Sequence, residues 1–291
     1  MPSLISLKRR IGSIKNTRQI TKAMELVSSS KLRRAQAAAV TSRAYRQAAY
    51  ELLARLNQVK EVERQPLFKK RPVQGRLYIV ITSNSGLAGA YNANVLKLLT
   101  QAVKQDRTDK VKSSCITIGS KGAQFVRRIE NVELAGHYPA FGDEPTERDI
   151  VPLLNTIIEN YKSGSVDEIR LLYTEFKSSL TQIATSLTLL PAGLELPAED
   201  VPAAPGFMNF EPDVETVIHN VGTRLIQAQI WQALLESLAS EHAMRAVAMK
   251  NATDNADDLI DDYTLEYNST RQGQITQEIA EITGGAEAMA A

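Results

Sequence analysis

The apolar positions near the end of the chain recur at helical spacing over a long stretch without proline. Residues 213 to 283 contain no proline, and only Gly222 and Gly273 interrupt the run. Apolar residues return at three- and four-residue intervals, as on one face of a helix: Val214, Val217, Ile218, Val221, Leu225, Leu234, Leu235 and Leu238. Such a helix spans roughly 105 Å at about 1.5 Å per residue, whereas a compact protein of this size has a radius of gyration of about 19 Å. The pattern predicts one C-terminal helix over residues 213–291 that needs an apolar partner outside a compact domain.

The beginning of the chain offers such a partner. Residues 3 to 65 also lack proline, Ser3 is a suitable N-cap residue, and Pro66 ends the run. The apolar stripe starts at Leu4, Leu7, Ile11 and Ile14, and it is expected to shift phase to Ile20, Met24 and Val27. Small residues follow that allow close helix approach, namely Ala35, Ala37, Ala38 and Ala39. The pattern predicts an N-terminal helix over residues 1–65 that forms half of a coiled coil.

The charges of the two segments are complementary. Residues 1–60 hold 13 Lys and Arg against two Glu, a net charge of +11, while residues 211–291 hold 4 basic and 14 acidic residues, a net charge of −10. Exposed ion pairs contribute only about 0.2–1 kcal/mol each. We therefore expect the apolar seam to supply most of the stability and the charges to select the partner. Because a folded domain separates the two segments, the helices are expected to lie antiparallel.

The periodicity changes between the two helical segments. Short β-rich runs predict strands at 77–82, 115–118, 169–176 and 182–190, and helical patterns predict helices at 92–105, 121–129 and 147–162. This alternation indicates a small, Rossmann-like α/β sheet domain over residues 75–190. Prolines between residues 191 and 212 then predict an extended connection to the C-terminal helix. The predicted fold class is thus α/β, with a long antiparallel coiled coil of the terminal helices and a central small sheet domain.

One loop of the central domain has the composition of a phosphate-binding loop. Ser83 to Asn92 (SNSGLAGAYN) lies where a strand passes into a helix, a place at which phosphate can be bound. The loop lacks both the full G-x-G-x-x-G pattern and the G-x-x-x-x-G-K-[ST] pattern. A structural turn is therefore favoured, and a phosphate-binding enzyme stays an alternative that predicts saturable nucleotide binding by residues 75–190.

The titratable residues do not form a recognisable catalytic or metal-binding pattern. His137, His219 and His242 are scattered and have no cysteine partners, so solvated or core histidines are the favoured interpretation. Five aspartates share one helical face without the Ca²⁺-loop pattern, and they are interpreted as an acidic face opposite basic neighbours: Asp254, Asp257, Asp258, Asp261 and Asp262. No cofactor and no metal is expected.

Composition excludes several classes of protein. With 43% hydrophobic and 23% charged residues the chain has ordinary soluble composition, and no apolar run approaches the roughly 20 residues that cross a bilayer. The single Cys115 forbids an internal disulfide and suits a reducing compartment. The basic N-terminal helix could neutralise nucleic-acid phosphates, but no aromatic residue interleaves with its charges before Tyr45. These basic residues are better explained as partners of the acidic C-terminal helix or of an acidic protein. The alternative interpretation is a coiled-coil structural protein associated with nucleic acid.

Three separated segments carry a specific resemblance. The run SLKRRIGSIKNTRQITKAMELVSSSKLRRAQ (residues 6–36), EHAMRAVAMKNATDNADDLI (241–260) and RQGQITQEIAEITGGA (271–286) resemble the gamma subunit of F-type ATP synthases of the bacterial type. The resemblance implies a non-catalytic central rotor shaft whose rotation couples proton flow through the membrane c ring to conformational cycling of the catalytic alpha/beta ring. Its implied partners are the alpha and beta subunits, the epsilon subunit and the c ring, with no nucleic acid. The implied location is peripheral, on the cytoplasmic face of the bacterial cell membrane.

The resemblance also assigns roles to individual residues. The positions implied to contact the alpha/beta ring are Lys22, Met24, Arg245, Arg271, Gln272, Thr276 and Glu278. Arg271 suits such a contact because its planar donor fork can hold a carboxylate through two hydrogen bonds. The implied apolar bearing at the upper end of the shaft consists of Ile275, Ile279 and Ile282. Met24 could equally be a residue of the coiled-coil core.

The chain departs from the family pattern in the glycine-containing loop. Many members have Asp, a basic residue, Gly, Leu, Cys and Gly after the first strand, and here the segment is Asn84, Ser85, Gly86, Leu87, Ala88 and Gly89. The usual cation of this loop is therefore missing at Ser85. The two-cysteine insert of chloroplast members is also missing, since Cys115 stands alone, so thiol control of that kind is not expected.

Overall fold

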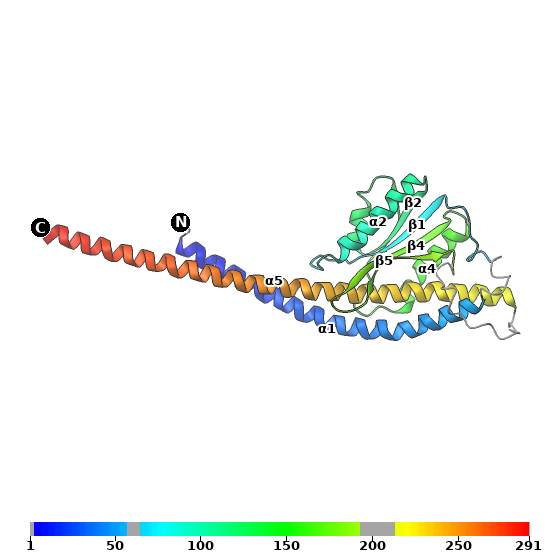
Figure 1. Cartoon of the computed structure of the whole chain (residues 1–291), viewed down its shortest axis with the longest axis horizontal. Helices are drawn as coiled ribbons and strands as arrows, with labels where there is room; N and C mark the ends of the chain where they lie inside the picture. The colour runs from blue at the N-terminus through cyan, green and yellow to red at the C-terminus, as the bar shows by residue number, and fades with distance from the viewer. Residues whose placement is uncertain (1–2, 57–64, 193–212, 291) are drawn as a thin grey trace. The chain divides into compact units, whose positions relative to one another are not determined.

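The computed structural model describes residues 3–56, 65–192 and 213–290 of the chain. Its elements are shown in Figure 1 and follow in the order α1 (Leu4–Leu56), β1 (Gly75–Ile81), α2 (Tyr91–Thr108), β2 (Lys112–Ile118), α3 (Ser120–Val126), β3 (Val132–Tyr138), η2 (Glu147–Ile150), α4 (Val151–Lys162), β4 (Glu168–Phe176), β5 (Gln182–Leu190) and α5 (Val214–Ala290). They form two compact units, Met1–Ser28 with Ala246–Ala291, and Ser29–Arg245. Most of the connection predicted over 191–212, and residues 57–64 of the predicted N-terminal helix, lie outside the described residues.

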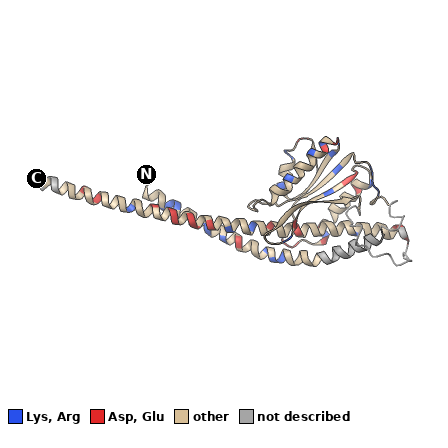
Figure 2. Ribbon diagram, in the orientation of Figure 1, with Lys and Arg blue, Asp and Glu red and all other residues tan. Residues whose placement is uncertain are grey.

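The first unit is an antiparallel pair of helices formed by the start of α1 and the end of α5. Along α1, successive residues meet progressively earlier residues of α5. The Arg10 guanidinium lies 5.9 Å from the centre of the Tyr263 ring, Arg18 forms an ion pair with Asp257, and the hydroxyls of Thr21 and Thr253 lie 2.8 Å apart. The predicted antiparallel coiled coil of the terminal helices is thus confirmed. Figure 2 shows the acidic residues of α5 gathered beside the basic start of α1, in agreement with the charge complementarity.

The seam of this coiled coil differs from the predicted one beyond Ile14. Leu7, Thr21 and Ser28 are buried, whereas Ile20 is 61% exposed and Val27 is 53% exposed. The predicted phase shift of the stripe to Ile20, Met24 and Val27 is therefore wrong. The seven-residue repeat continues unbroken from Leu7 to Ser28, and a polar side chain is tolerated at Thr21 because its hydroxyl pairs with that of Thr253.

The second unit contains a five-stranded sheet in the order β3-β2-β1-β4-β5. The first four strands are parallel, and β5 runs antiparallel to β4. This order, with helices between the parallel strands, is that of a doubly wound α/β sheet, and it confirms the predicted Rossmann-like fold class. Strand β3 is an edge strand that the sequence pattern did not predict, because its alternating half-buried and exposed residues include Gly136 and His137 rather than a run of β-branched residues.

The two faces of the sheet are covered by different helices, with α2 on one side and α4 and α5 on the other (Figure 1). Side chains of a strand alternate between faces, so Leu77, Ile79 and Ile81 of β1 belong to the cluster that includes α4 and α5 residues. Tyr78 and Val80 belong to the cluster on the α2 and α3 side. Strand β1 is consequently buried on both faces, which explains its uninterrupted apolar sequence.

Helix α5 is attached to the sheet by hydrogen bonds as well as by apolar packing. The Thr174 amide of β4 donates to the Ser237 hydroxyl at 3.1 Å, and the Ser240 hydroxyl donates to the Thr174 carbonyl at 3.3 Å. Phe176, at the end of β4, is buried with Ala35 of α1 and with alanines of α5. These contacts fix α5 to the carboxyl end of β4.

Two further findings concern the described residues as a whole. None of the helices in this part of the chain has the length and apolar character that a membrane crossing requires. Within the same residues, no group of three or more His, Cys, Asp or Glu side chains is placed to hold a metal ion.

Candidate functional site

The loop between β1 and α2 (residues 82–90, the β1–α2 loop) is held to neighbouring segments by several hydrogen bonds, among them one from the Lys121 amide to the Ser83 carbonyl at 3.1 Å and those of one amide side chain. The Asn84 Oδ1 atom accepts hydrogen bonds from the amides of Ser120 and Ala140, at 3.2 and 3.1 Å. Its Nδ2 atom donates to the Ala140 carbonyl at 3.2 Å. Asn84 thus ties the loop to the start of α3 and to the segment after β3.

Side chains within the β1–α2 loop and α2 fix its internal conformation. The Ser83 amide donates to Asn92 Oδ1 at 3.0 Å, and Asn92 Nδ2 donates to Ser83 Oγ at 2.8 Å. Gly89 has a φ of 54° and Leu87 a φ of 61°, both in the left-handed region, and the Leu87 side chain is 61% exposed. The polar groups of the loop are used to build a turn with an apolar tip, which favours the structural interpretation of this glycine-containing segment over a phosphate site.

Arg245 of α5 reaches the same loop. Its Nη2 atom lies 2.7 Å from Glu241 Oε1, one helical turn earlier on α5. It also donates to Ser85 Oγ at 3.3 Å and to the Gly86 carbonyl at 3.4 Å. Arg245 is only 8% exposed. The structure thus brings together three residues that the sequence assigned to separate roles, Arg245 as a ring contact and Ser85 and Gly86 as the divergent loop.

Glu241 completes this arrangement, and sequence reasoning did not single it out. Burial raises the pKa of Glu241, and the Arg245 guanidinium opposes that rise. Burial also raises the pKa of Tyr91, with the nearby Glu241 carboxylate as a further cause. The signal that could have identified Glu241 is its i, i+4 spacing from Arg245, because residues so spaced are neighbours on a helix.

A second polar cluster lies where α1, α5 and the segment after β3 meet. Lys31 pairs with Asp143 at 2.7 Å, and Arg34 pairs with Glu144 at 2.9 Å. His242 is 4% exposed, its Nε2 atom lies 3.7 Å from Asp143 Oδ1, and neither of its ring nitrogens has a hydrogen-bond partner among the described residues. Burial, together with the charge of Arg245, lowers the pKa of His242 to about 4. These basic residues of α1 are thus used within the chain, but their partners lie in the segment after β3 and not on the acidic C-terminal helix, with which the charge pattern predicted the pairing.

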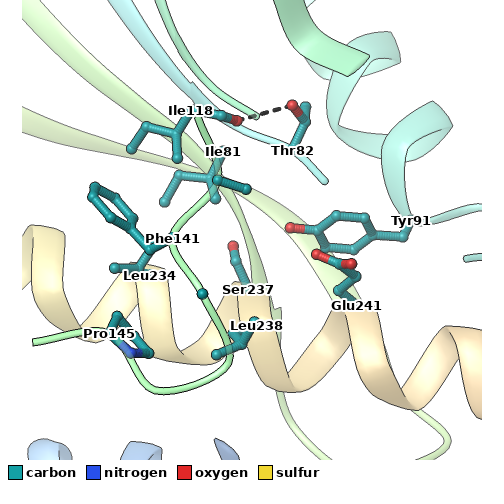
Figure 3. A pocket seen from close by; sticks show the side chains of 12 residues that line it. Ile81, Thr82, Tyr91, Ile118, Phe141, Pro145, Leu234, Ser237, Leu238 and Glu241 are labelled. Carbon is teal, nitrogen blue, oxygen red and sulfur yellow. Dashed lines mark hydrogen bonds between the residues drawn. The ribbon is translucent and has the colours of Figure 1, made fainter. Parts of the chain in front are cut away.

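A small cavity lies between the end of β1, the segment around Phe141 and α5 (Figure 3). Its volume is about 20 Å³, which is room for about one water molecule, whereas pockets for small molecules measure about 300–1,000 Å³. Figure 3 shows the Tyr91 hydroxyl and the Glu241 carboxylate lying side by side at one end of the cavity. The cavity does not have the size of a substrate site.

The remaining predicted contact residues lie in the first unit. On α1, Lys22 is exposed and pairs with Glu25 at 3.0 Å, and Met24 is half-buried. On α5, the residues implied to contact the ring are all exposed: Arg271, Gln272, Thr276 and Glu278. The residues of the implied bearing are exposed as well, Ile275 by 48%, Ile279 by 56% and Ile282 by 71%.

The exposure of this end of α5 follows from the lengths of the two helices. Every residue from 271 to 286 is exposed, and Figure 1 shows α5 continuing beyond the first turn of α1. A lone helix of this kind is marginal in water unless tertiary packing supports it. Its isoleucines are therefore available to a partner rather than to the core of the chain.

These features define a class of protein: one that exposes long helical surfaces and also contains a doubly wound α/β domain. Comparison with known proteins gives the family. A family model described as ATP synthase matches residues 3–289. The ATP synthase gamma chain of Stenotrophomonas maltophilia is 39% identical over 99% of this chain and 100% of its own length. The ATP synthase gamma chain of Pelotomaculum thermopropionicum is 40% identical over 99% of this chain and 100% of its own length. The chain belongs to the ATP synthase gamma chain family, and it is a non-catalytic subunit of a membrane-associated complex.

Solved structures agree with this family at the level of the fold. A chain of the central stalk and c-ring structure of Tetrahymena thermophila mitochondrial ATP synthase matches with a TM-score of 0.64 and 22% identity, covering 80% of this chain and 99% of its own. A chain of the OSCP/F1/c-ring structure of the Euglena gracilis mitochondrial ATP synthase matches with a TM-score of 0.68 and 18% identity. The match covers 98% of this chain and 94% of the Euglena chain. At these identities the likeness describes the architecture alone.

Proposed function

We propose that this chain is the central rotor shaft of an F-type ATP synthase. In this role its rotation couples proton flow through the membrane c ring to conformational cycling of the catalytic alpha/beta ring. The observation that carries the proposal is the match to gamma chains over the full length, including both terminal helices and the central sheet domain. The family match favours this function over a coiled-coil nucleic-acid-associated protein, as do the basic side chains of α1 that pair with acids of the chain itself.

The two helical segments and the sheet domain have distinct tasks in this proposal. Residues 1–65 and 213–291 form the shaft, residues 75–190 form the foot beside the epsilon subunit and the c ring, and residues 191–212 connect them. The complex sits on the cytoplasmic face of a bacterial membrane. A shaft needs stiffness along its axis, and two proline-free helices with a buried seam provide it.

The shaft acts by contacting its partners unequally in their different states. A ligand shifts a conformational equilibrium only by its differential affinity for the two states, and an asymmetric helical surface offers a different contact to each beta subunit as it turns. Lys22, Met24, Arg271 and Gln272 lie on this surface in the proposal, with Thr276 and Glu278. Charge-assisted hydrogen bonds of Arg271 and Gln272, at about 1.5–3 kcal/mol each, are strong enough to favour one state and weak enough to be exchanged at each step.

The exposed isoleucines of α5 serve as a bearing. Ile275, Ile279 and Ile282 offer apolar area without hydrogen-bond donors or acceptors on their side chains. Contacts of this kind are non-directional, so rotation within an apolar sleeve does not break specific bonds. This explains why apolar residues are kept on an otherwise exposed helix.

Co-purification with partner subunits tests the proposal. The full chain is expressed with alpha- and beta-type ATP synthase chains, and a tag on this chain is used for isolation. We expect a stoichiometric complex that hydrolyses ATP and whose ATP hydrolysis pumps protons when it is joined to its membrane sector. Recovery of the chain alone under conditions in which the other subunits are folded would contradict the proposal.

A further inference from the structure

The guanidinium of Arg245 joins α5 to the β1–α2 loop at a point where family members carry a cation. It bonds to Glu241 on its own helix and to Ser85 Oγ and the Gly86 carbonyl in the loop. Arg245 is 160 residues from Ser85 in sequence. The contact is therefore a tertiary link between the second helix of the coiled coil and the sheet domain.

The burial of Arg245 gives this link a physical reason. A buried guanidinium needs both a counter-charge and acceptors for its donors, and at 8% exposure Arg245 receives its counter-charge from Glu241 and its further acceptors from the loop. The helix that carries it is fixed in turn, because Ser237 and Ser240 bond to the backbone of Thr174. The position of the guanidinium is thus set by α5, and the loop is held to it.

Ser85 fits this arrangement better than a cation would. The Ser85 hydroxyl accepts a hydrogen bond from Arg245, whereas a second guanidinium or ammonium at this position would face a like charge. The positive charge beside the loop is therefore supplied by α5, already paired with Glu241. The exposed tip of the loop is the apolar side chain of Leu87.

We infer that Arg245 is a positioning residue: it holds the β1–α2 loop against α5, so that the exposed Leu87 at the tip of the loop keeps a fixed position on α5 for contact with a partner subunit. The inference rests on the proposed function for the identity of the partner. It assigns Arg245 an action through the loop in place of a direct contact with the ring. Breaking the link leaves the shaft able to turn and the base of the loop held by Asn84, while the tip of the loop around Leu87 is no longer held to α5.

Spin labels test the link in the full chain. Labels are attached at Leu87→Cys in the loop and Arg224→Cys on α5, both exposed positions. The native Cys115 is 0% exposed, and burial raises its pKa to about 12, so it does not react. We expect one narrow distance distribution in the parent and a second, broader population in Arg245→Gln. An unchanged distribution in Arg245→Gln overturns the inference.

Variants of Ser85 guard against the chance that Arg245→Gln unfolds locally by leaving Glu241 without its counter-charge. Ser85→Ala removes the hydroxyl acceptor but keeps the Arg245–Glu241 pair. We expect the population of chains whose loop is detached from α5 to rise by about 2- to 12-fold, which corresponds to the net free energy of one hydrogen bond. Ser85→Thr keeps a hydroxyl and should restore the parent distribution. The matched control Arg128→Gln, at an exposed position, should leave it unchanged. Equal distributions for Ser85→Ala and Ser85→Thr count against the link.

The assembled complex then tests positioning. With Ser85→Ala and Arg245→Gln we expect normal assembly but fewer protons pumped per ATP hydrolysed than in the parent, and non-additive effects in the double variant because the two residues share one contact. Parent-like pumping in a variant whose loop is detached overturns the positioning role. Failure of the parent chain to assemble would instead contradict the proposed function, and the distance measurements on the chain would still decide whether the link exists.

Discussion

At the residue scale, the structure shows polar side chains in positions that apolar patterning alone would not select. Thr21 and Thr253 meet in the coiled-coil seam, and Arg245 with Glu241 lies buried between helix and loop. Each of these polar side chains can be accommodated there because it has a hydrogen-bond or ion-pair partner. A buried donor or acceptor without a partner costs about 1–3 kcal/mol. Single residues of this kind fix the register of long elements that apolar contacts alone would allow to slide.

His242 should make the stability of the chain depend on pH. Its folded pKa of about 4 lies below the unfolded value of about 6.5, so the unfolded state binds more protons between these values. The contribution of neutral His242 to the free energy of unfolding is complete above about pH 6.5 and is lost as the pH falls toward 4. The free energy of unfolding should therefore fall by roughly 2 kcal/mol between pH 7 and pH 5. Chemical denaturation at both pH values measures it.

The matched variants for this prediction are His242→Gln and His137→Gln. His242→Gln should lose most of the pH dependence in this range, whereas His137→Gln, at an exposed position, should keep that of the parent. The same slope in all three proteins would show that protonation of His242 does not oppose folding.

Ser85→Arg should leave the overall fold intact, because Ser85 is exposed and a longer side chain can extend into solvent, although the change removes the hydroxyl to which Arg245 donates. If the loop meets an acidic partner during rotation, the new cation forms an exposed ion pair with it, worth about 0.2–1 kcal/mol. This is roughly a 1.4- to 5-fold change in ATP hydrolysis if the contact acts on the limiting step. The change should be screened by salt, so rates of reconstituted head complexes are compared at about 0.05 and 0.5 M salt. Identical rates and salt slopes for the two proteins would show that the loop meets no acidic partner.

At the scale of elements, the coiled coil and the sheet are specified by different means. The coiled coil depends on a seven-residue repeat in which Leu7 and Ser28 are both buried. The sheet depends on two-sided burial of β1 and β4, with helices on both faces. Helix α5 belongs to both, because it packs on α1 and also covers one face of the sheet.

The register of the coiled coil can be tested with a cysteine pair. The Thr21 and Thr253 hydroxyls lie 2.8 Å apart, so Thr21→Cys with Thr253→Cys should form a disulfide within one chain under mild oxidation. The control pair, Lys22→Cys with Thr253→Cys, should not, because Lys22 is exposed on another face of α1. Mass spectrometry of proteolytic fragments identifies the bond. Cross-links that form only between chains, or equally in both pairs, would be inconsistent with this seam.

At the scale of the whole molecule, the chain is divided by task rather than by sequence order. Residues distant in sequence form the first unit, and the second unit contains the sheet together with the remaining parts of α1 and α5. The long exposed end of α5 has no partner among the described residues of the chain. Because the chain is a subunit of a membrane-associated complex, its function is measured within that complex.

Arg271→Ala with Gln272→Ala should impair turnover more than assembly. Both residues are exposed on α5, so folding of the chain does not depend on them. A few charge-assisted hydrogen bonds of about 1.5–3 kcal/mol each are small beside the apolar contact that the proposed bearing residues would make with the ring. We expect the double variant to assemble and to turn over ATP more slowly. Normal ATP turnover with normal proton pumping would rule out the role proposed for this pair.

The sequence by itself determined the long terminal helices, the α/β class of the central domain and the family. Helix periodicity and the absence of proline are local properties, so α1 and α5 could be predicted without knowing what they contact. The exposed contact residues of α5, from Arg271 to Ile282, were assigned by resemblance, and the structure places them where a partner can reach them.

The tertiary structure alone decided which residues meet. The seam runs through Thr21 and Ser28 rather than Ile20 and Val27, because the phase of a coiled coil is set by the partner helix and not by the local density of apolar residues. Strand β3 forms because β2 offers an open edge for pairing. Arg245 faces the β1–α2 loop because folding brings together residues 160 positions apart, and a contact at that separation leaves no periodic signal in the sequence.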